Sequence, residues 1–121
     1  WSVTKIFWDV TPSDKKCFVA PPHLGSSHNR GRAVDVSIYN LKTGAPVEMP
    51  SGYDEMTHRA FPDYDGGSAE SRKLRDLLRS TMEANGFVVH DCEWWHFDYM
   101  PLDKAPVMDI PFGKIRAGAA R

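Results

Sequence analysis

The spacing of apolar positions predicts one clear helix in the chain. Between positions 68 and 85, apolar residues recur at the spacing of a helix, namely Leu74, Leu77, Leu78 and Met82. Ser68 is a suitable N-cap, because its hydroxyl can accept a hydrogen bond from the first turn. Asn85-Gly86 is suited to end the helix. We therefore expect the main helix over 68–85.

Residues 33–39 alternate between β-branched and polar side chains, which predicts a strand. Successive side chains of a strand point to opposite faces. The core face would carry Val34, Val36 and Ile38. Asp35 would lie on the opposite face, and that face must line something polar, because a carboxylate in apolar surroundings is costly unless it is paired or coordinated.

Other segments complete the expected fold. Residues 87–90 and 94–99 read as two further strands, and residues 17–20 as a short one. Residues 1–8 fit the end of either a helix or a strand. Residues 51–67 are rich in Asp, Gly and Pro, which predicts a long loop with a short helical turn. Because strands and helices do not alternate regularly, we expect an α+β fold with a small antiparallel sheet, one main helix and flanking loops.

Length and composition fit one globular domain. The chain has 121 residues, of which 41% are hydrophobic and 26% charged. The net charge of −1 and the scattered basic residues argue against a nucleic-acid partner. The sequence has no run near the roughly 20 apolar residues of a membrane span. Residues 113–121 have the composition of a tail.

Cys17 and Cys92 are the two cysteines of the chain. They are far apart and form no CxxC pair, so a thiolate zinc site has little support. Two buried or free thiols are the simpler interpretation. A disulfide stays open, and it would matter only in an oxidising compartment.

Two short segments carry the chemistry of a metal site. His28 and Asp35 lie seven positions apart, and Glu93 and His96 lie three positions apart. A catalytic zinc site needs three protein ligands, an open position for water and a nearby general base. We therefore expect His28, Asp35 and His96 to hold the metal if the four side chains converge. Glu93 would then take a proton from water.

Each of these residues also has a structural interpretation: a surface-loop histidine for His28, a salt bridge to Arg30 or Arg32 for Asp35, a core histidine for His96, and an arginine partner for Glu93. Geometry adds a constraint. Positions 93 and 96 of a regular strand face opposite sides of a sheet. A shared site therefore requires a β-bulge, or a place for Glu93 in the turn before the strand.

The same segments resemble a known family. Ser26 to Asp35 closely resembles the SxHxxGxAxD motif of the zinc D-Ala-D-Ala peptidases, and residues 93–96 resemble their ExxH motif in its EWWH form. The combination looks most like the VanX-type D-alanyl-D-alanine dipeptidases. Thr43-Gly44, Met49 and the segment 53–56 (Tyr-Asp-Glu-Met) add to the likeness, which runs over residues 19–112.

The resemblance implies a role for each motif residue. It makes His28, Asp35 and His96 the ligands of one zinc ion per chain, and Glu93 the general base. Ser26 and Asp54 match positions that hold the free ammonium group of the substrate. A hydroxyl and a carboxylate can do this through charge-assisted hydrogen bonds.

The implied protein is a single zinc D,D-dipeptidase catalytic domain over residues 1–121, with a fold of the hedgehog/DD-peptidase type. It would hydrolyse the D-alanyl-D-alanine dipeptide, either in glycopeptide resistance or in recycling of dipeptide from peptidoglycan. One alternative is a related D,D- or L,D-carboxypeptidase or endopeptidase that acts on peptidoglycan peptides. Another is a non-catalytic zinc-binding domain, against which Glu93 argues, because a structural site needs no base.

One departure from the family pattern concerns the oxyanion. The family carries a stabilising arginine, and a tyrosine near the substrate, in an N-terminal segment that has no counterpart here. We expect that segment to be missing, and the chain alone to bind zinc but to hydrolyse the dipeptide slowly or not at all, because loss of such a contact costs about 10²–10³ in rate. Expected partners are the dipeptide, the missing segment as a separate piece, and a second copy in a homo-oligomer. The family implies the bacterial cytoplasm or periplasm, with the cytoplasm preferred.

Overall fold

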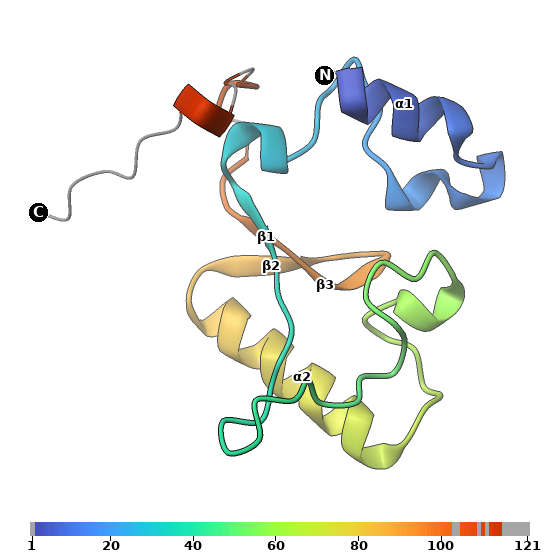
Figure 1. The fold of residues 1–121 in the computed structure, drawn as a ribbon, viewed down its shortest axis with the longest axis vertical. Coiled ribbons are helices and arrows are strands. Elements are labelled where there is room, and N and C mark those ends of the chain that lie inside the picture. The colour runs from blue at the N-terminus through green and yellow to red at the C-terminus, as the bar shows by residue number, and fades with distance from the viewer. Residues whose placement is uncertain (1, 103–104, 109, 111, 115–121) are drawn as a thin grey trace, which may run out of the picture.

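The structure, a computed structural model, describes residues 2–102, 105–108, 110 and 112–114. Of the expected tail, residues 115–121 lie outside the described residues. The elements follow one another in this order (Figure 1): α1 Ser2–Val10, the 3₁₀ turns η1 Ser13–Phe18 and η2 His28–Arg30, β1 Ala33–Asp35, η3 His58–Ala60, α2 Ala69–Ala84, β2 Phe87–His90, β3 Glu93–Tyr99 and η4 Phe112–Lys114.

Within the described residues, the sheet has three strands in the order β1-β3-β2, and both pairings are antiparallel. The longest strand, β3, is therefore central and is paired along both of its edges. Figure 1 shows α2 below the sheet and α1 above it. The expected α+β class, with a small antiparallel sheet and one main helix, is confirmed. No helix in the described part of the chain is long and apolar enough to cross a membrane.

The main helix begins and ends where its sequence signals stand. The Ser68 hydroxyl accepts a hydrogen bond from the backbone N–H of Ser71 at 3.0 Å, which caps the first turn of α2. After Asn85 the chain leaves the helix through Gly86, whose φ of 84° is a left-handed conformation that glycine adopts without strain. Leu78 and Arg75 are buried on the inner face of the helix.

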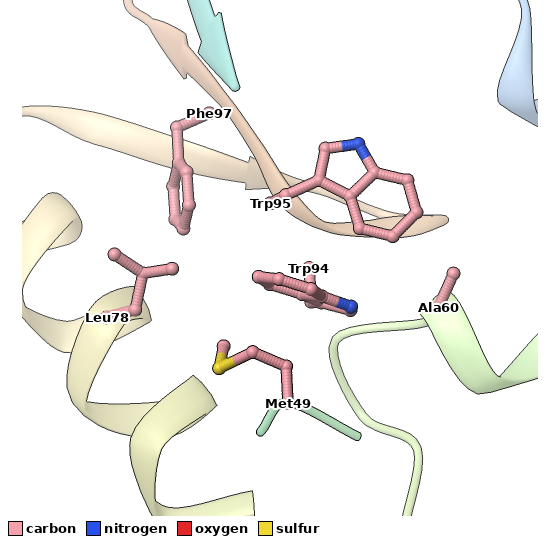
Figure 2. Packing of buried hydrophobic residues seen from close by; sticks show 6 residues of the cluster. All are labelled: Met49, Ala60, Leu78, Trp94, Trp95 and Phe97. Atoms are coloured by element: carbon pink, nitrogen blue, oxygen red, sulfur yellow. The ribbon is translucent and has the colours of Figure 1, made fainter. Parts of the chain in front are cut away.

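The core lies between α2 and the sheet. Half of its buried residues come from β3, and the other half are single residues from three other segments: Met49, Ala60, Leu78, Trp94, Trp95 and Phe97. In Figure 2, Phe97 points toward Leu78 and Trp94 lies above Met49. Positions 94 and 97 of a regular strand would face opposite sides. That both nevertheless pack in this cluster agrees with a β3 that is irregular between them.

The strand register locates this irregularity. Phe87, Val88 and Val89 of β2 pair in order with Tyr99, Asp98 and Phe97 of β3, but the next residue, His90, pairs with Glu93. One step along β2 therefore spans four steps along β3. Against β1 the pairing stays regular, and Asp35 lies opposite His96. The irregular backbone that a shared site for Glu93 and His96 requires is confirmed.

Two expected strands differ from the structure. The strand expected over 17–20 is wrong: Ser13–Phe18 form η1, and the prolines that follow at positions 21 and 22 have no N–H to donate to a sheet ladder. The strand expected over 33–39 ends at Asp35, although Tyr39 forms an isolated bridge with Pro46.

The faces expected for the strand over 33–39 hold only in part. Val36 and Ile38 pack against the core as expected. Val34, also expected there, is 39% exposed because β1 is an edge strand. Of residues 1–8, for which the sequence fits the end of either a helix or a strand, residues 2–8 belong to α1, and Trp1 lies outside the described residues. The loop over 51–67 carries its expected turn as η3.

One buried hydrogen bond ties the core to the long loop. The Trp94 indole N–H donates to the Ser51 hydroxyl at 2.9 Å, and both residues are buried. Ser51→Ala leaves that N–H without its partner, so we expect the free energy of unfolding to fall by about 1–3 kcal/mol in urea titrations. Ser80→Ala, on the exposed face of α2, should change it by less than about 0.5 kcal/mol. Equal stability of the two variants would contradict this role.

Candidate metal centre

Three segments bring the predicted metal ligands together. His28 lies in η2, Asp35 ends β1 and His96 lies on β3 directly opposite Asp35. Between His28 and β1 the chain reverses at Gly31, which has a φ of 62°. Because a left-handed residue is most easily a glycine, this position lets His28 fold back over the end of the strand.

The ligand atoms lie at the spacing that a small metal ion needs. The Nδ1 atom of His96 is 3.0 Å from Asp35 Oδ1, and the Nε2 atom of His28 is 3.3 Å from Asp35 Oδ2. The two histidine nitrogens are 3.1 Å apart. Ligands at about 2.0 Å from a tetrahedral zinc ion lie about 3.3 Å from one another. His28, Asp35 and His96 therefore form a group that can hold a metal ion.

The group is closed on one side and open on the other. The His96 side chain is buried with 8% exposed, whereas the His28 side chain is 41% exposed. The open side faces a cavity of about 750 Å³, which Ser26, Asp54 and Trp95 also line. Pockets of about 300–1,000 Å³ are typical of small-molecule sites. A metal ion held here could therefore be reached by a small ligand.

Hydrogen bonds within the group set its electrostatics. Burial alone would raise the pKa of Asp35, but hydrogen bonds from His28 and His96 hold that pKa well below its usual range. Burial alone would lower the pKa of His96, yet its hydrogen bonds to Asp35 and Asp98 raise that pKa. Asp35 is thus an anion at neutral pH, as a metal ligand must be.

Glu93 lies beside the group without belonging to it. Its Oε2 atom is 3.6 Å from His96 Nδ1, and its side chain is 15% exposed. Burial raises the pKa of Glu93 to about 7; His96 opposes the shift, and the charges of Asp35 and Asp54 add to it. A carboxyl group that titrates near neutral pH suits a general base. The irregularity of β3 is what brings Glu93 to this side.

Ser26 and Asp54 line the same cavity, so the structure brings all six predicted site residues to one place. The Ser26 hydroxyl accepts a hydrogen bond from the backbone N–H of His28 at 3.2 Å. Asp54 has a φ of 59°, a left-handed conformation that aspartate tolerates better than most residues. Burial and the charge of Asp35 raise the pKa of Asp54. Such local strain is typical of functional loops.

Sequence reasoning missed two neighbours of the centre. Asp98 Oδ1 lies 3.1 Å from His96 Nε2. His90 lines the cavity with its Nδ1 atom 4.0 Å from Glu93 Oε2, and burial, with the charge of His96, lowers its pKa. The two-residue spacing from His96 could have indicated Asp98, because such residues share a face of a strand. His90 had no such signal, since its approach depends on the shifted register.

The two cysteines lie outside the metal group. Both are free thiols. Burial and a hydrogen bond with Cys17 raise the pKa of Cys92 to about 12. A thiol with that pKa stays protonated at neutral pH, so Cys92 is a poor metal ligand and a poor nucleophile.

The chain is similar to known peptidases. The model of a family described as D-ala-D-ala dipeptidase matches residues 6–110. Over 89 residues the chain is 43% identical to a D-alanyl-D-alanine dipeptidase of Enterococcus faecium. These matched residues make up 74% of this chain and 43% of that relative. The chain is 29% identical over 107 residues to a D-alanyl-D-alanine dipeptidase of Escherichia coli strain K12. This match covers 88% of this chain and 54% of the relative.

A third relative has the same description. The chain is 42% identical over 73 residues to a D-alanyl-D-alanine dipeptidase of Enterococcus faecalis. This match covers 60% of this chain and 36% of that relative. The chain thus spans between 36% and 54% of the length of these three relatives.

The raised pKa of Glu93 predicts a pH-dependent stability of the metal-free protein. A folded pKa of about 7, above the ordinary 4.5, stabilises the fold below pH 4.5, and that contribution is lost as the pH rises through 7. Glu93→Gln removes the buried charge. In thermal melts with a chelator, we expect the free energy of unfolding of the variant, relative to that of the parent, to be higher at pH 8 than at pH 5, by at most about 3 kcal/mol. Exposed Glu48 gives the control, Glu48→Gln, and an equal difference at both pH values would contradict the prediction.

Proposed function

Because the chain belongs to the D-Ala-D-Ala dipeptidase family, we propose that it forms the zinc-binding catalytic part of an enzyme that hydrolyses D-alanyl-D-alanine to two molecules of D-alanine. We assign residues 1–121 to a single catalytic domain. One observation carries the proposal: the ligand atoms of His28, Asp35 and His96 converge beside the Glu93 carboxyl group in one cavity.

His28, Asp35 and His96 would hold one zinc ion. Two imidazole nitrogens and one carboxylate oxygen are a donor set found in catalytic zinc sites, and their mutual distances of 3.0–3.3 Å support the assignment. When bound, zinc lowers the pKa of water to about 7 and polarises the scissile carbonyl group. The exposed side of His28 leaves room for substrate.

Glu93 would move the proton. As the carboxylate, it takes a proton from the attacking water, and as the acid, it passes that proton to the nitrogen of the departing D-alanine. A pKa near 7 suits both steps, because neither form is then strongly disfavoured at neutral pH. Glu93 can act in this way since it lies beside the ligands without being one of them.

Ser26 and Asp54 would recognise the amino end of the substrate. Both line the cavity that the metal group faces. A carboxylate and a hydroxyl can hold an ammonium group through charge-assisted hydrogen bonds. This recognition would favour a free dipeptide over a longer peptide, whose corresponding nitrogen is an uncharged amide.

The family resemblance predicts that an arginine in an N-terminal segment, which has no counterpart here, stabilises the oxyanion, and this stays a prediction. Among the described residues, the cavity is lined by one basic side chain outside the histidines, Lys16. Its ammonium group contacts the Trp8 carbonyl oxygen and lies 4.4 Å from the centre of the Trp8 ring. Lys16 is thus already engaged on the side of α1. Slow turnover by the 121 residues alone is therefore still our expectation.

The biological role follows from the substrate. D-Alanyl-D-alanine is a peptidoglycan precursor, so its hydrolysis would serve glycopeptide resistance or the recycling of dipeptide from the cell wall. We propose a bacterial enzyme that works in the cytoplasm or the periplasm. A homo-oligomer and a separately supplied N-terminal segment remain proposals as well.

A matched pair of variants separates metal binding from catalysis. We expect His96→Ala to lose most bound zinc, because the centre keeps only two ligands. Glu93→Gln should keep stoichiometric zinc and lose about 10²–10⁴-fold in kcat, because the base is gone. Metal analysis and hydrolysis assays on the same preparations measure both. Undiminished zinc in His96→Ala, or nearly full kcat in Glu93→Gln, would contradict the assigned roles.

Substrate comparison distinguishes a dipeptidase from a carboxypeptidase. We expect D-Ala-D-Ala to be hydrolysed faster than N-acetyl-D-Ala-D-Ala or a tripeptide ending in D-Ala-D-Ala. Asp54→Asn, which keeps the shape and tolerates the backbone conformation, should lower kcat/KM for the free dipeptide by about 10–100-fold, as loss of a charge-assisted hydrogen bond does. It should leave the acetylated substrate nearly unaffected. Faster cleavage of the blocked or longer peptides would favour the carboxypeptidase alternative.

A further inference from the structure

The His96 ring is contacted at both of its nitrogens. Nδ1 faces the metal group, at 3.0 Å from Asp35 Oδ1 and 3.1 Å from His28 Nε2. Nε2 faces the opposite way, at 3.1 Å from Asp98 Oδ1 and 3.2 Å from the Ser27 hydroxyl. The His96 ring thus lies between its two partners in the metal group, His28 and Asp35, and the carboxylate of Asp98.

The two nitrogens of a neutral imidazole have different roles. One carries a proton and the other a lone pair, and the partner of the first decides which is which. For Nδ1 to donate its lone pair to a metal, the proton must sit on Nε2. Asp98, as a carboxylate, accepts hydrogen bonds only, so it favours the Nε2–H form. Asp35 favours a proton on Nδ1 in the metal-free chain, but it loses this effect once a metal ion takes the Nδ1 lone pair and Asp35 binds the same ion. The Ser27 hydroxyl both donates and accepts, so it selects neither form.

Asp98 is well placed for this task. It follows His96 by two residues on β3, so the two side chains share a face. Its backbone is paired on both sides, with Ala33 of β1 and Val88 of β2. The Asp98 side chain is 18% exposed and that of His96 is 8% exposed. A hydrogen bond shielded from water in this way is stronger than one at the surface.

We propose that Asp98 is a positioning residue of the metal centre, which holds His96 with its proton on Nε2 and its Nδ1 lone pair directed at the metal. The inference rests on the proposed function, in that His96 is a ligand. Asp98 acts through His96 and touches neither metal nor substrate in this role. Such carboxylate–histidine pairs orient ligands, and their loss weakens metal affinity by about 10–100-fold.

Zinc affinity of variants tests the proposal. We expect Asp98→Asn to raise the zinc Kd by about 10–100-fold in competition with a chromophoric chelator. Asp98→Glu should restore part of the affinity because it keeps the charge. Asp91→Asn, in the exposed turn between β2 and β3, is the matched control and should bind zinc as the parent does. A zinc Kd for Asp98→Asn within about threefold of the parent would overturn the proposal.

A measurement on the unmodified chain covers the case in which a variant fails to fold. In the zinc-loaded parent, ¹⁵N NMR should place the His96 proton on Nε2 and show it protected from exchange with water. A proton on Nδ1, or an unprotected Nε2–H, would overturn the proposal. Failure of the parent to bind zinc would overturn the proposed function as well. Normal zinc binding by both the parent and Asp98→Asn would overturn this inference alone.

Discussion

The irregular stretch of β3 is the constraint on which the rest of the molecule depends. A regular strand would send Glu93 and His96 to opposite faces. It would also separate Trp94 from Phe97, which share one cluster against α2. The shifted pairing with β2 resolves both conflicts, and the regular pairing with β1 keeps His96 opposite Asp35. The core and the metal group are therefore two results of the same backbone distortion.

The cavity concentrates negative charge. Within the described residues, four carboxylates line it, those of Asp35, Asp54, Glu93 and Asp98. Mutual repulsion contributes to the raised pKa of Glu93 and of Asp54. A divalent cation among them would lower those pKa values again. Metal uptake and proton release are thus coupled in this arrangement, and each depends on pH through the same groups.

Residue type and spacing predicted that His28, Asp35 and His96 come together, because zinc restricts its ligands to few side chains, and the structure brings their ligand atoms to one place. Their surroundings were harder to predict. The helix over 68–85 was found from its periodicity and its cap. The exposure of Val34 was not, because it depends on which strand lies at the edge of the sheet. His90 was also missed, because only the shifted register brings it to the cavity, and the size of that shift is set by tertiary packing.

The hydrogen bond between Trp94 and Ser51 has a consequence for substrate length. Trp94 follows Glu93 directly, and Ser51 precedes Asp54 by three residues. One buried contact therefore links the strand that carries Glu93 to the loop that carries Asp54. Under the roles proposed for Glu93 and Asp54, the core beneath the cavity would fix the distance between the cleavage point and the amino end of the substrate. In relatives of this chain, residues gained or lost between Ser51 and Asp54 would change this distance, and the preferred peptide length would change with it.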